Sequence, residues 1–381
     1  MDQLDVVVIG GGIAGASAAW ALAGSGRRVA LVEQEPQPGL HATGRSAATL
    51  SETSGARAVC ALAAASRPFL ADPPDGFADH PLLAPRGLLW IGRDGDGPLL
   101  DALAAHGRTI NPSVRRLDPA EVMSVLPMLR EDAVGAGGVD EPEAMAIDVA
   151  GLLAGYLRGL RRAGGTTYVS NEAVELSRDA QGWTVVGSSA TLRAPVVVNA
   201  AGAWGDVVAE RAGVPPIGLK PLRRTACLVP APDEVRDWPL VMDIASRCYF
   251  EPEAGGLLLS PADETLDAPC DARAEELDVA LALDRLRETT KLTVRSVRRA
   301  WAGLRTFSAD GVPIAGFDPD APGFFWLVGQ AGAGIKTAPA LATITVALVA
   351  GERLPASVAA AGVGFDELAP ARFRPASHPD L

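Results

Sequence analysis

The chain has 381 residues, 48% of them hydrophobic, and a formal net charge of −12 at pH 7. This length allows two domains and a large core, and the hydrophobic content is typical of a globular protein and not of a disordered one. The negative charge argues against nucleic acid as a partner and makes anionic membrane surfaces unfavourable.

The cysteines and the apolar segments limit the cellular context. The four cysteines show no C-x-x-C spacing, which predicts reduced thiols in a cytoplasmic protein and neither a disulfide framework nor a metal site. The apolar start carries two aspartates and no basic segment, so we do not interpret it as a signal peptide. The late apolar run at 338–350 is too short to span a bilayer, and we expect no stable membrane insertion.

The first part of the chain alternates strand and helix. The run of β-branched residues at 6–9 predicts a strand buried on both faces. An alanine-rich stretch at 13–24 predicts a helix, and residues 28–32 predict a second strand. This order is typical of a dinucleotide-binding unit of the Rossmann kind.

Three glycines at the turn between the first strand and the helix carry the chemistry of this unit. Gly10, Gly12 and Gly15 have the G-x-G-x-x-G spacing, and Glu33 ends the second strand. Such glycines allow a tight turn, close approach of a pyrophosphate and close packing of the helix on the strand. The helix N-terminus favours phosphate, and an acid at the position of Glu33 holds a ribose hydroxyl. The motif predicts dinucleotide binding but does not separate NAD from FAD.

The rest of the chain alternates between two kinds of sequence pattern. Buried strands followed by small-residue turns recur at 194–204 and 323–337, and these segments predict a return to the first domain. Between them lie regions with short strands, many turns and a few helices, starting near residue 82 and again near residue 219. The order predicts a discontinuous first domain with a second domain inserted into it.

Five ordered stretches resemble the D-amino-acid oxidase-like (DAO) family of FAD oxidoreductases, and within it most of all the D-arginine dehydrogenases. They are GGGIAGAS near the N-terminus, HATGRSAA at 41–48, VVNAAGAW at 197–204, WAGLRTFSADG at 301–311 and GFFWLVGQAGAGIKT at 323–337. The resemblance implies an α/β protein with a discontinuous Rossmann-like FAD-binding domain and an antiparallel-sheet α+β substrate domain. The expected bounds are 1–81, 146–218 and 299–381 for the first domain, and 82–145 and 219–298 for the second.

The resemblance implies FAD as the cofactor. No cysteine occurs in the stretch 301–311, where some sarcosine oxidase-like members attach their flavin, so we expect noncovalent FAD. The turn that opens the last helix would bring N–H donors and a positive helix end to the negative charge of the reduced flavin. The residues expected to contact FAD are Gly10, Gly12, Ile13, Ala14, Gly15, Glu33, Gln34, His41, Thr43, Gly44, Arg45, Ser46, Ala47, Ala48, Ala173, Val174, Ala200, Gly202, Trp204, Gly303, Gly332, Ala333, Gly334, Ile335, Lys336 and Thr337.

The expected catalytic residues follow from what an amino-acid substrate needs. A guanidinium holds a carboxylate through two parallel hydrogen bonds. By resemblance, Arg305 fills this role, Arg224 assists it, and Tyr249 donates a phenolic hydrogen bond. Two alternatives stay open, because Arg223 competes with Arg224, and Tyr249 could be plain core packing. Lys336 stands where sarcosine oxidase-like members have a lysine, and it could bind a carboxylate, assist oxygen or point to solvent.

Departures from the D-arginine dehydrogenases bear on the substrate. Leu88 stands where those enzymes have an acid that holds the substrate guanidinium, and Ser54 lies in the loop where they carry a tyrosine over the ligand. Together with Gly332, these residues form the expected substrate pocket, which we expect to be roomy and apolar. Glu52 lies close enough in sequence to replace the missing acid.

The resulting hypothesis is oxidation of the C–N bond of an amino acid by hydride transfer to flavin N5. We expect a small-molecule substrate, a D-amino acid with a neutral or apolar side chain, and oxygen or another electron acceptor as the partner that reoxidises the flavin. A neutral amine needs no strong base for this step. The alternatives are a secondary-amine oxidase acting on N-methyl or cyclic amino acids, and a non-catalytic flavin electron-transfer subunit. The sequence does not indicate an oligomeric state.

Overall fold

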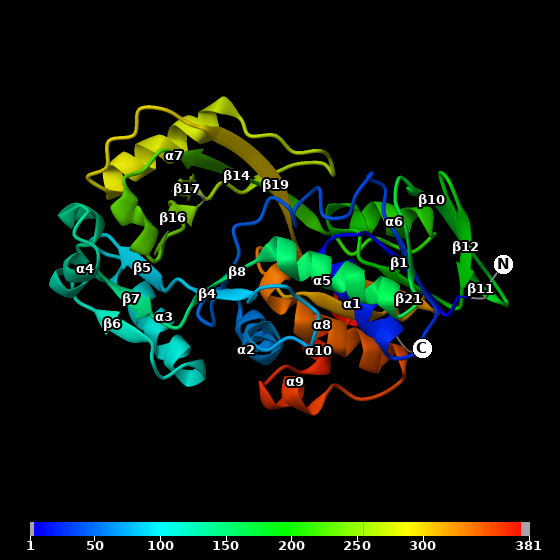
Figure 1. The fold of residues 1–381 in the computed structure, drawn as a ribbon. Helices are drawn as coiled ribbons and strands as arrows, with labels where there is room; N and C mark the ends of the chain where they lie inside the picture. The colour runs from blue at the N-terminus through cyan, green and yellow to red at the C-terminus, as the bar shows by residue number, and fades with distance from the viewer. Residues whose placement is uncertain (1–3, 254, 375–381) are drawn as a thin grey trace, which may run out of the picture.

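A six-stranded sheet forms the centre of one part of the molecule (Figure 1). The computed structural model describes residues 4–253 and 255–374, so the outermost residues of the predicted domain bounds, and residue 254, lie outside the described residues. Neighbouring strands are parallel except for the pair β20 and β21. In spatial order the strands are β20 (Ile314–Phe317), β21 (Phe324–Val328), β13 (Val196–Asn199), β1 (Val6–Ile9), β2 (Val29–Val32) and β9 (Thr166–Tyr168).

Helices cover one face of this sheet and a small sheet covers the other. The helical face carries α1 (Ile13–Gly24) and α8 (Gly334–Val349), which pack on each other and on α5 (Val149–Arg162) and α2 (Arg57–Ala71). Because both faces are covered, all residues of β1 and β2 are buried. The opposite face carries β10 (Ala173–Asp179), β11 (Gly182–Gly187), β12 (Thr191–Ala194) and α6 (Gly205–Arg211). This α/β arrangement confirms the predicted Rossmann-like fold.

The second part of the molecule is built on a ten-stranded sheet, at the left and top of Figure 1. All its strand pairs are antiparallel except the parallel pair β5 and β15. In spatial order the strands are β22 (Gln330–Ala331), β19 (Arg299–Phe307), β14 (Lys220–Val229), β17 (Gly256–Ser260), β16 (Tyr249–Glu253), β15 (Leu240–Asp243), β5 (Leu88–Gly92), β7 (Gly137–Glu141) and β6 (Arg115–Leu117), with β18 (Thr265–Leu266) on β14.

The two faces of the large sheet have different neighbours, because successive side chains of a strand point to opposite faces. Leu89 and Phe250 point to the face covered by α4 (Pro119–Val125) and α7 (Glu276–Thr289). Leu88 and Tyr249 point to the other face, where an apolar cluster includes residues of α3 (Gly97–Ile110). The second face is the one that meets the six-stranded part, and it supplies residues to the site.

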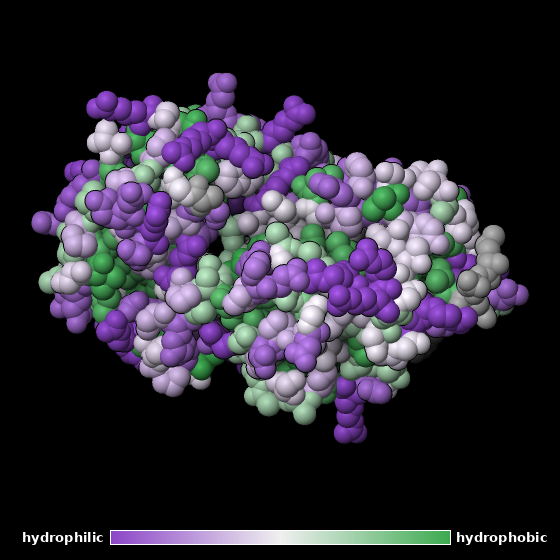
Figure 2. Space-filling model, in the orientation of Figure 1, coloured by the Kyte–Doolittle hydropathy of each residue, from purple (hydrophilic) through white to green (hydrophobic). Residues whose placement is uncertain are grey.

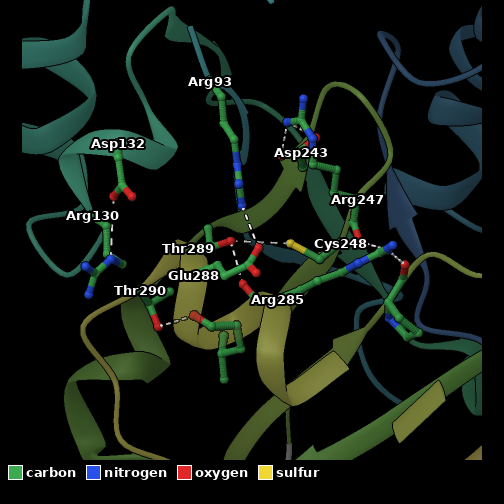
Figure 3. Close-up of polar contacts among 12 residues, drawn as sticks. Arg93, Arg130, Asp132, Asp243, Arg247, Cys248, Arg285, Glu288, Thr289 and Thr290 are labelled. Carbon is green, nitrogen blue, oxygen red and sulfur yellow. Dashed lines mark hydrogen bonds and ion pairs between the residues drawn. The ribbon is translucent and has the colours of Figure 1, made fainter. Parts of the chain in front are cut away.

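The C-terminal end of α7 is fixed to the large sheet by polar contacts (Figure 3). The Thr289 hydroxyl lies 3.7 Å from Cys248 Sγ, and Arg93 donates a 3.1 Å hydrogen bond to the Glu288 carboxylate. Burial raises the pKa of the Cys248 thiol to about 11, so the thiol stays protonated at neutral pH. These contacts hold the C-terminal end of α7 against the large sheet.

Short elements join the two parts or lie at their edges. A three-stranded sheet of β3 (Thr49–Leu50), β8 (Met145–Ile147) and β4 (Leu83–Pro85) lies between them (Figure 1). Among the helices of residues 4–253 and 255–374, none has the length and apolar character needed to cross a bilayer. The remaining elements are α9 (Ala356–Ala360), α10 (Phe365–Leu368) and the 3-10 turns Glu131–Ala133, Gly202–Trp204, Asp233–Asp237 and Pro370–Phe373.

Two elements differ from what the sequence patterns predict. The last helix begins at Gly334, so Lys336 and Thr337 are helical and not part of the preceding turn. Strand β19 pairs with β14 of the large sheet, although the expected bounds assign residues from 299 onward to the FAD-binding domain. Neither feature has a strong local signal in the sequence. The start of the last helix is rich in glycine, and the pairing of β19 depends on a segment distant in sequence.

Candidate active site

The glycine motif shapes the turn between β1 and α1. Gly10 has a φ of +106°, and a Cβ at this residue would lie 2.4 Å from the carbonyl oxygen of Ala200. A Cβ at Gly15 would lie 1.9 Å from the Gly10 carbonyl oxygen. Only glycine fits either position. The close approach keeps the N-terminus of α1 beside the carboxyl ends of the strands, where open sheets bind their ligands.

Glu33 is buried beside this turn. Its carboxylate accepts hydrogen bonds from the backbone N–H groups of Gly11, at 2.6 Å, and Glu35, at 2.8 Å. Burial raises the pKa of Glu33, and the two N–H donors oppose that rise. Each oxygen still has a free lone pair. The carboxylate is therefore held in place with acceptor capacity left for a ligand hydroxyl.

The loop after β2 is fastened on both sides of the cavity. Thr43 Oγ1 accepts the Ile13 N–H at 2.9 Å, which ties the loop to the start of α1. Arg45 donates to the carbonyl oxygens of Ala272, at 2.8 Å, and Ala302, at 2.9 Å, on the other part of the molecule. The ring of His41 lies 4.7 Å from that of Trp204. This loop thus lies across the junction between the two parts.

Arg305 and Tyr249 meet at the end of the cavity formed by the large sheet. Arg305 Nη2 donates a 3.2 Å hydrogen bond to Tyr249 Oη. The Arg305 and Arg224 guanidinium carbons lie 5.7 and 5.9 Å from the centre of the Tyr249 ring. A Cβ at Gly332 would lie 3.2 Å from Arg305 Nη1, so a side chain at Gly332 would crowd this guanidinium. Two cations and a phenol therefore gather around one small volume.

Strand geometry distinguishes Arg224 from Arg223. Arg224 lines the cavity, and its Nε and Nη2 donate to the Asp263 carbonyl and to the Glu264 carboxylate. Burial lowers the pKa of Arg224, and the charge of Arg305 lowers it further. Arg223 points to the opposite face, where its guanidinium reaches carboxylates at 2.5, 3.5 and 3.6 Å.

One continuous cavity joins the glycine motif to the arginines, and the surface is hollowed where the two parts meet (Figure 2). Most of the predicted residues line this cavity. They are Gly10, Gly12, Ile13, Ala14, Glu33, Gln34, His41, Thr43, Arg45, Ser46, Ala47, Ala173, Ala200, Gly202, Trp204, Arg224, Tyr249, Gly303, Arg305, Gly332, Gly334 and Ile335.

Other predicted residues do not line the cavity, and for several of them the structure shows why. Thr337 is fully buried and donates its hydroxyl to the Ala333 carbonyl. Val174 is 44% exposed, because it points away from Ala173 on the same strand. Leu88 is fully buried in the apolar cluster under the large sheet. The predicted residues not on the wall are Gly15, Gly44, Ala48, Ser54, Leu88, Val174, Ala333, Lys336 and Thr337.

Several wall residues carry no sequence motif that would have identified them. Ala272 and Cys270 come from the loop before α7, which Arg45 joins to the FAD-binding part. Gln330 lies next to the glycine-rich turn, and its Nε2 is buried without a hydrogen-bond partner. Asn171 and Glu172 follow β9, the edge strand beside β2. Only the rule that ligands lie at the carboxyl ends of parallel strands could have indicated Asn171 and Glu172.

The wall fits an extended FAD. The free N–H groups at the start of α1 suit a pyrophosphate, and the Glu33 carboxylate suits a ribose. A Cβ at Gly202 would meet no protein atom within 4 Å, so the wall is open there. Gln330 offers an unpaired donor to a polar ring. No group of His, Cys, Asp and Glu able to hold a metal ion occurs in residues 4–253 and 255–374.

The fold and the cavity agree with the comparisons to known proteins. The model of the DAO family, described as FAD dependent oxidoreductase, matches residues 5–348. A glycine oxidase of Geobacillus kaustophilus (strain HTA426) is 27% identical over 362 residues, which cover 91% of this chain and 93% of that protein. The crystal structure of glycine oxidase from Geobacillus kaustophilus superposes with a TM-score of 0.82 at 24% identity, covering 93% of this chain and 96% of that one.

A structure with bound cofactor is also similar in fold. The dithionite-reduced L-alpha-glycerophosphate oxidase from Mycoplasma pneumoniae with FAD bound has a TM-score of 0.82 at 18% identity, and the alignment covers 92% of this chain and 95% of that one. The chain belongs to the DAO family of FAD-dependent oxidoreductases. It is an FAD-dependent oxidoreductase.

Proposed function

We propose that this enzyme oxidises the C–N bond of an amino acid with a neutral or apolar side chain, of D configuration, to the imino acid. The observation that carries the proposal is the pairing of Arg305 with Tyr249 in the same cavity as the FAD motif. Arg305 has no carboxylate partner among the described residues. A half-buried guanidinium without an anion is suited to a substrate carboxylate.

The arrangement of the phenol supports the same role. Tyr249 Oη accepts a hydrogen bond from Arg305, so the hydroxyl proton of Tyr249 is free to be donated. Arg224 is held by Asp263 and Glu264, and its guanidinium carbon lies 5.9 Å from the centre of the Tyr249 ring. The three groups would grip one carboxylate and orient the neighbouring Cα. FAD, when bound, supplies the acceptor for the hydride.

The charges around the substrate also favour the reactive amine. Two guanidinium groups disfavour an ammonium nearby, so they lower the pKa of a bound substrate amine. The neutral amine is the form that gives up a hydride, and no general base is then needed. We expect kcat/KM to rise with pH until the amine of the free substrate has lost its proton.

The proposed side-chain preference rests on the same charges. Among the residues that line the cavity, the carboxylates Glu33 and Glu172 are at the nucleotide end, and Glu172 is paired with Arg211 at 2.7 Å. A cationic side chain would face Arg305 and Arg224 without an acid. We therefore propose a D-amino acid dehydrogenase or oxidase related to the D-arginine dehydrogenases but selective for neutral substrates. Four free cysteines support a cytoplasmic location.

A substrate panel tests the proposal. Purified protein would be mixed with D-, L- and N-methyl amino acids, with oxygen uptake and dye reduction followed in parallel. The proposal expects turnover with neutral D-amino acids. Turnover only with N-methyl or cyclic amino acids would favour the alternative, a secondary-amine oxidase. Turnover with L-amino acids alone would overturn the proposed D configuration, and no turnover of any amino acid would overturn both proposals.

A further inference from the structure

Lys336 is a buried cation that the proposed chemistry does not use. It lies in the first turn of α8, it is 5% exposed, and it is not on the cavity wall. A positive charge in the first turn of a helix is unfavourable, because the helix dipole has its positive end there. Burial lowers the pKa of Lys336. The ammonium therefore needs strong partners to remain in this place.

The partners are three oxygen atoms of one loop. Lys336 Nζ donates to the Ser51 carbonyl at 3.0 Å, to the Ser54 carbonyl at 2.8 Å and to Ser54 Oγ at 2.7 Å. An ammonium has three donors, so all its hydrogen bonds are made within the protein. No donor is left for a substrate carboxylate.

Glu141 of β7 holds the same loop from the other side. This fully buried carboxylate accepts the Glu52 N–H at 2.7 Å and the Ser51 hydroxyl at 2.8 Å, and it also accepts the Thr53 hydroxyl. The loop at 51–54 thus lies between a cation of the FAD-binding part and an anion of the large sheet. Opposite charges on the two sides stabilise each other in this dry environment.

Contacts lead from this loop to the arginine end of the cavity. Thr53 Oγ1 accepts the Trp90 indole N–H at 3.1 Å. Trp90 belongs to the same apolar cluster as Tyr249 and Ala47, both of which line the cavity. On the other side, Gly334 and Ile335 precede Lys336 and also line it. Displacement of the loop would therefore loosen two walls.

We propose that Lys336 is a positioning residue that fastens the loop at 51–54 between α8 and β7 and so fixes the substrate end of the cavity. It does not contact the substrate. This role differs from the three that the sequence leaves open, which are carboxylate binding, oxygen activation and exposure to solvent.

The first test uses the lysine content of the chain. The only other lysines of the sequence are Lys220 and Lys291, and both are exposed. Native holoenzyme would be treated with an amine-acetylating reagent, and the labelling rate of each lysine would be followed by mass spectrometry. We expect Lys336 to label at least about tenfold more slowly than the other two, with the same rate when a competitive carboxylate ligand is present. Equal rates, or ligand protection of Lys336, would overturn the proposal.

The second test compares Lys336→Met with Lys220→Met as the matched control. Amide hydrogen exchange of the peptide that covers residues 49–56 should accelerate by about tenfold or more in Lys336→Met and stay unchanged in the control. Ser54→Ala removes one of the three acceptors and should give a smaller acceleration. Unchanged exchange in Lys336→Met would overturn the proposal without bearing on the proposed function.

The third test is kinetic, and it depends on the proposed function. With a neutral amino acid, Lys336→Met should raise KM at least about fivefold while kcat changes less than about twofold, because the loop holds the binding walls and takes no part in bond breaking. A collapse of kcat at unchanged KM would mean a catalytic role and would overturn the proposal. The labelling and exchange results stand independently if no amino acid is turned over.

Discussion

At the scale of single residues, the site depends on a guanidinium whose charge has no anion in the protein. Arg305 is held in orientation by its hydrogen bond to Tyr249, and the lack of a side chain at Gly332 leaves room beside its Nη1. A planar guanidinium binds a carboxylate through two hydrogen bonds, which an ammonium does not reproduce.

Replacing Arg305 tests this point. Arg305→Lys keeps the charge and loses the two-point contact, so both kcat and apparent affinity for an amino acid should fall. Arg305→Ala should cost about 2–5 kcal/mol in kcat/KM, as when a buried charged partner is removed. FAD content is the control, because loss of the cofactor would by itself abolish turnover. Near-normal turnover of Arg305→Ala with full FAD content would mean that another group holds the carboxylate.

A second prediction at this scale concerns basic substrates. A cationic side chain would have to be desolvated beside Arg305 and Arg224 without an acid partner. We predict that neutral or apolar D-amino acids exceed D-arginine and D-lysine in kcat/KM by at least about tenfold, or roughly 1.4 kcal/mol. Steady-state kinetics over a matched set of D-amino acids measures this ratio. D-arginine as the best substrate would show that an acid such as Glu52 reaches the ligand after all.

The residues that could be predicted from sequence are those whose chemistry depends on local spacing. Gly10 and Gly15 follow from a turn that accepts only glycine at these two positions, and the spacing of the motif indicates Glu33 at the end of the second strand. Arg224 could not be separated from Arg223 without the pairing of β14. Leu88 and Lys336 resemble site residues by position, but their burial depends on how distant segments pack.

At the scale of elements, the faces of the large sheet separate structural from functional positions. On β16, Tyr249 points to the cavity, whereas Phe250 points to the face covered by α4 and α7. Glu251 shares the face of Tyr249 and is buried with Arg86 at 3.4 Å. Burial raises the pKa of Glu251 to about 7, and the charge of Arg86 opposes that rise.

The positions of strands and helices could largely be predicted from the periodicity of the sequence. The pairing of β19 with β14 could not, because it joins distant segments and has no local signal.

Glu251 makes the stability of this sheet depend on pH. Its folded-state pKa lies above the unfolded value, so its contribution is fully present below about pH 4.5 and is lost as pH rises through about 7. The difference of about 2.5 pKa units corresponds to roughly 3 kcal/mol. Glu251→Gln should therefore become more stable relative to wild type by up to about that amount between pH 4.5 and pH 8.

Denaturant unfolding of both proteins across this pH range measures the effect. Glu175→Gln, at an exposed position of β10 that does not act on Glu251, is the control and should show no such trend. A stability difference between wild type and Glu251→Gln that does not change with pH would contradict the assignment.

At the scale of the whole molecule, the two parts build one cavity whose ends have different chemistry. The nucleotide end offers N–H groups, glycines and the carboxylate of Glu33, and the other end offers two cations and a phenol. The division into two interleaved parts could be predicted from the alternation of the two sequence patterns. The position of the loop before α7 at the cavity could not be predicted, because it follows from the packing of α7.

The mode of cofactor attachment is testable on the intact protein. Cys270 is a cavity residue, but burial raises the pKa of its thiol, which disfavours the reactive thiolate. We predict that acid precipitation of the yellow protein releases FAD into the supernatant, as measured by its absorbance. Flavin that stays with the pellet would mean a covalent link, with Cys270 as the first residue to examine.

The most direct test of the central claim is anaerobic reduction of the bound flavin by a neutral amino acid and by the amide of the same amino acid. The two compounds differ in the charge offered to Arg305, Arg224 and Tyr249, and the rates are compared at a pH at which both amines are neutral, because the amine of the amide has the lower pKa. We predict that the amino acid bleaches the visible flavin absorbance at least about a hundredfold faster than the amide, because the amide makes no charge-assisted contact. Equal rates for the two, or no reduction by any amino acid, would contradict the account.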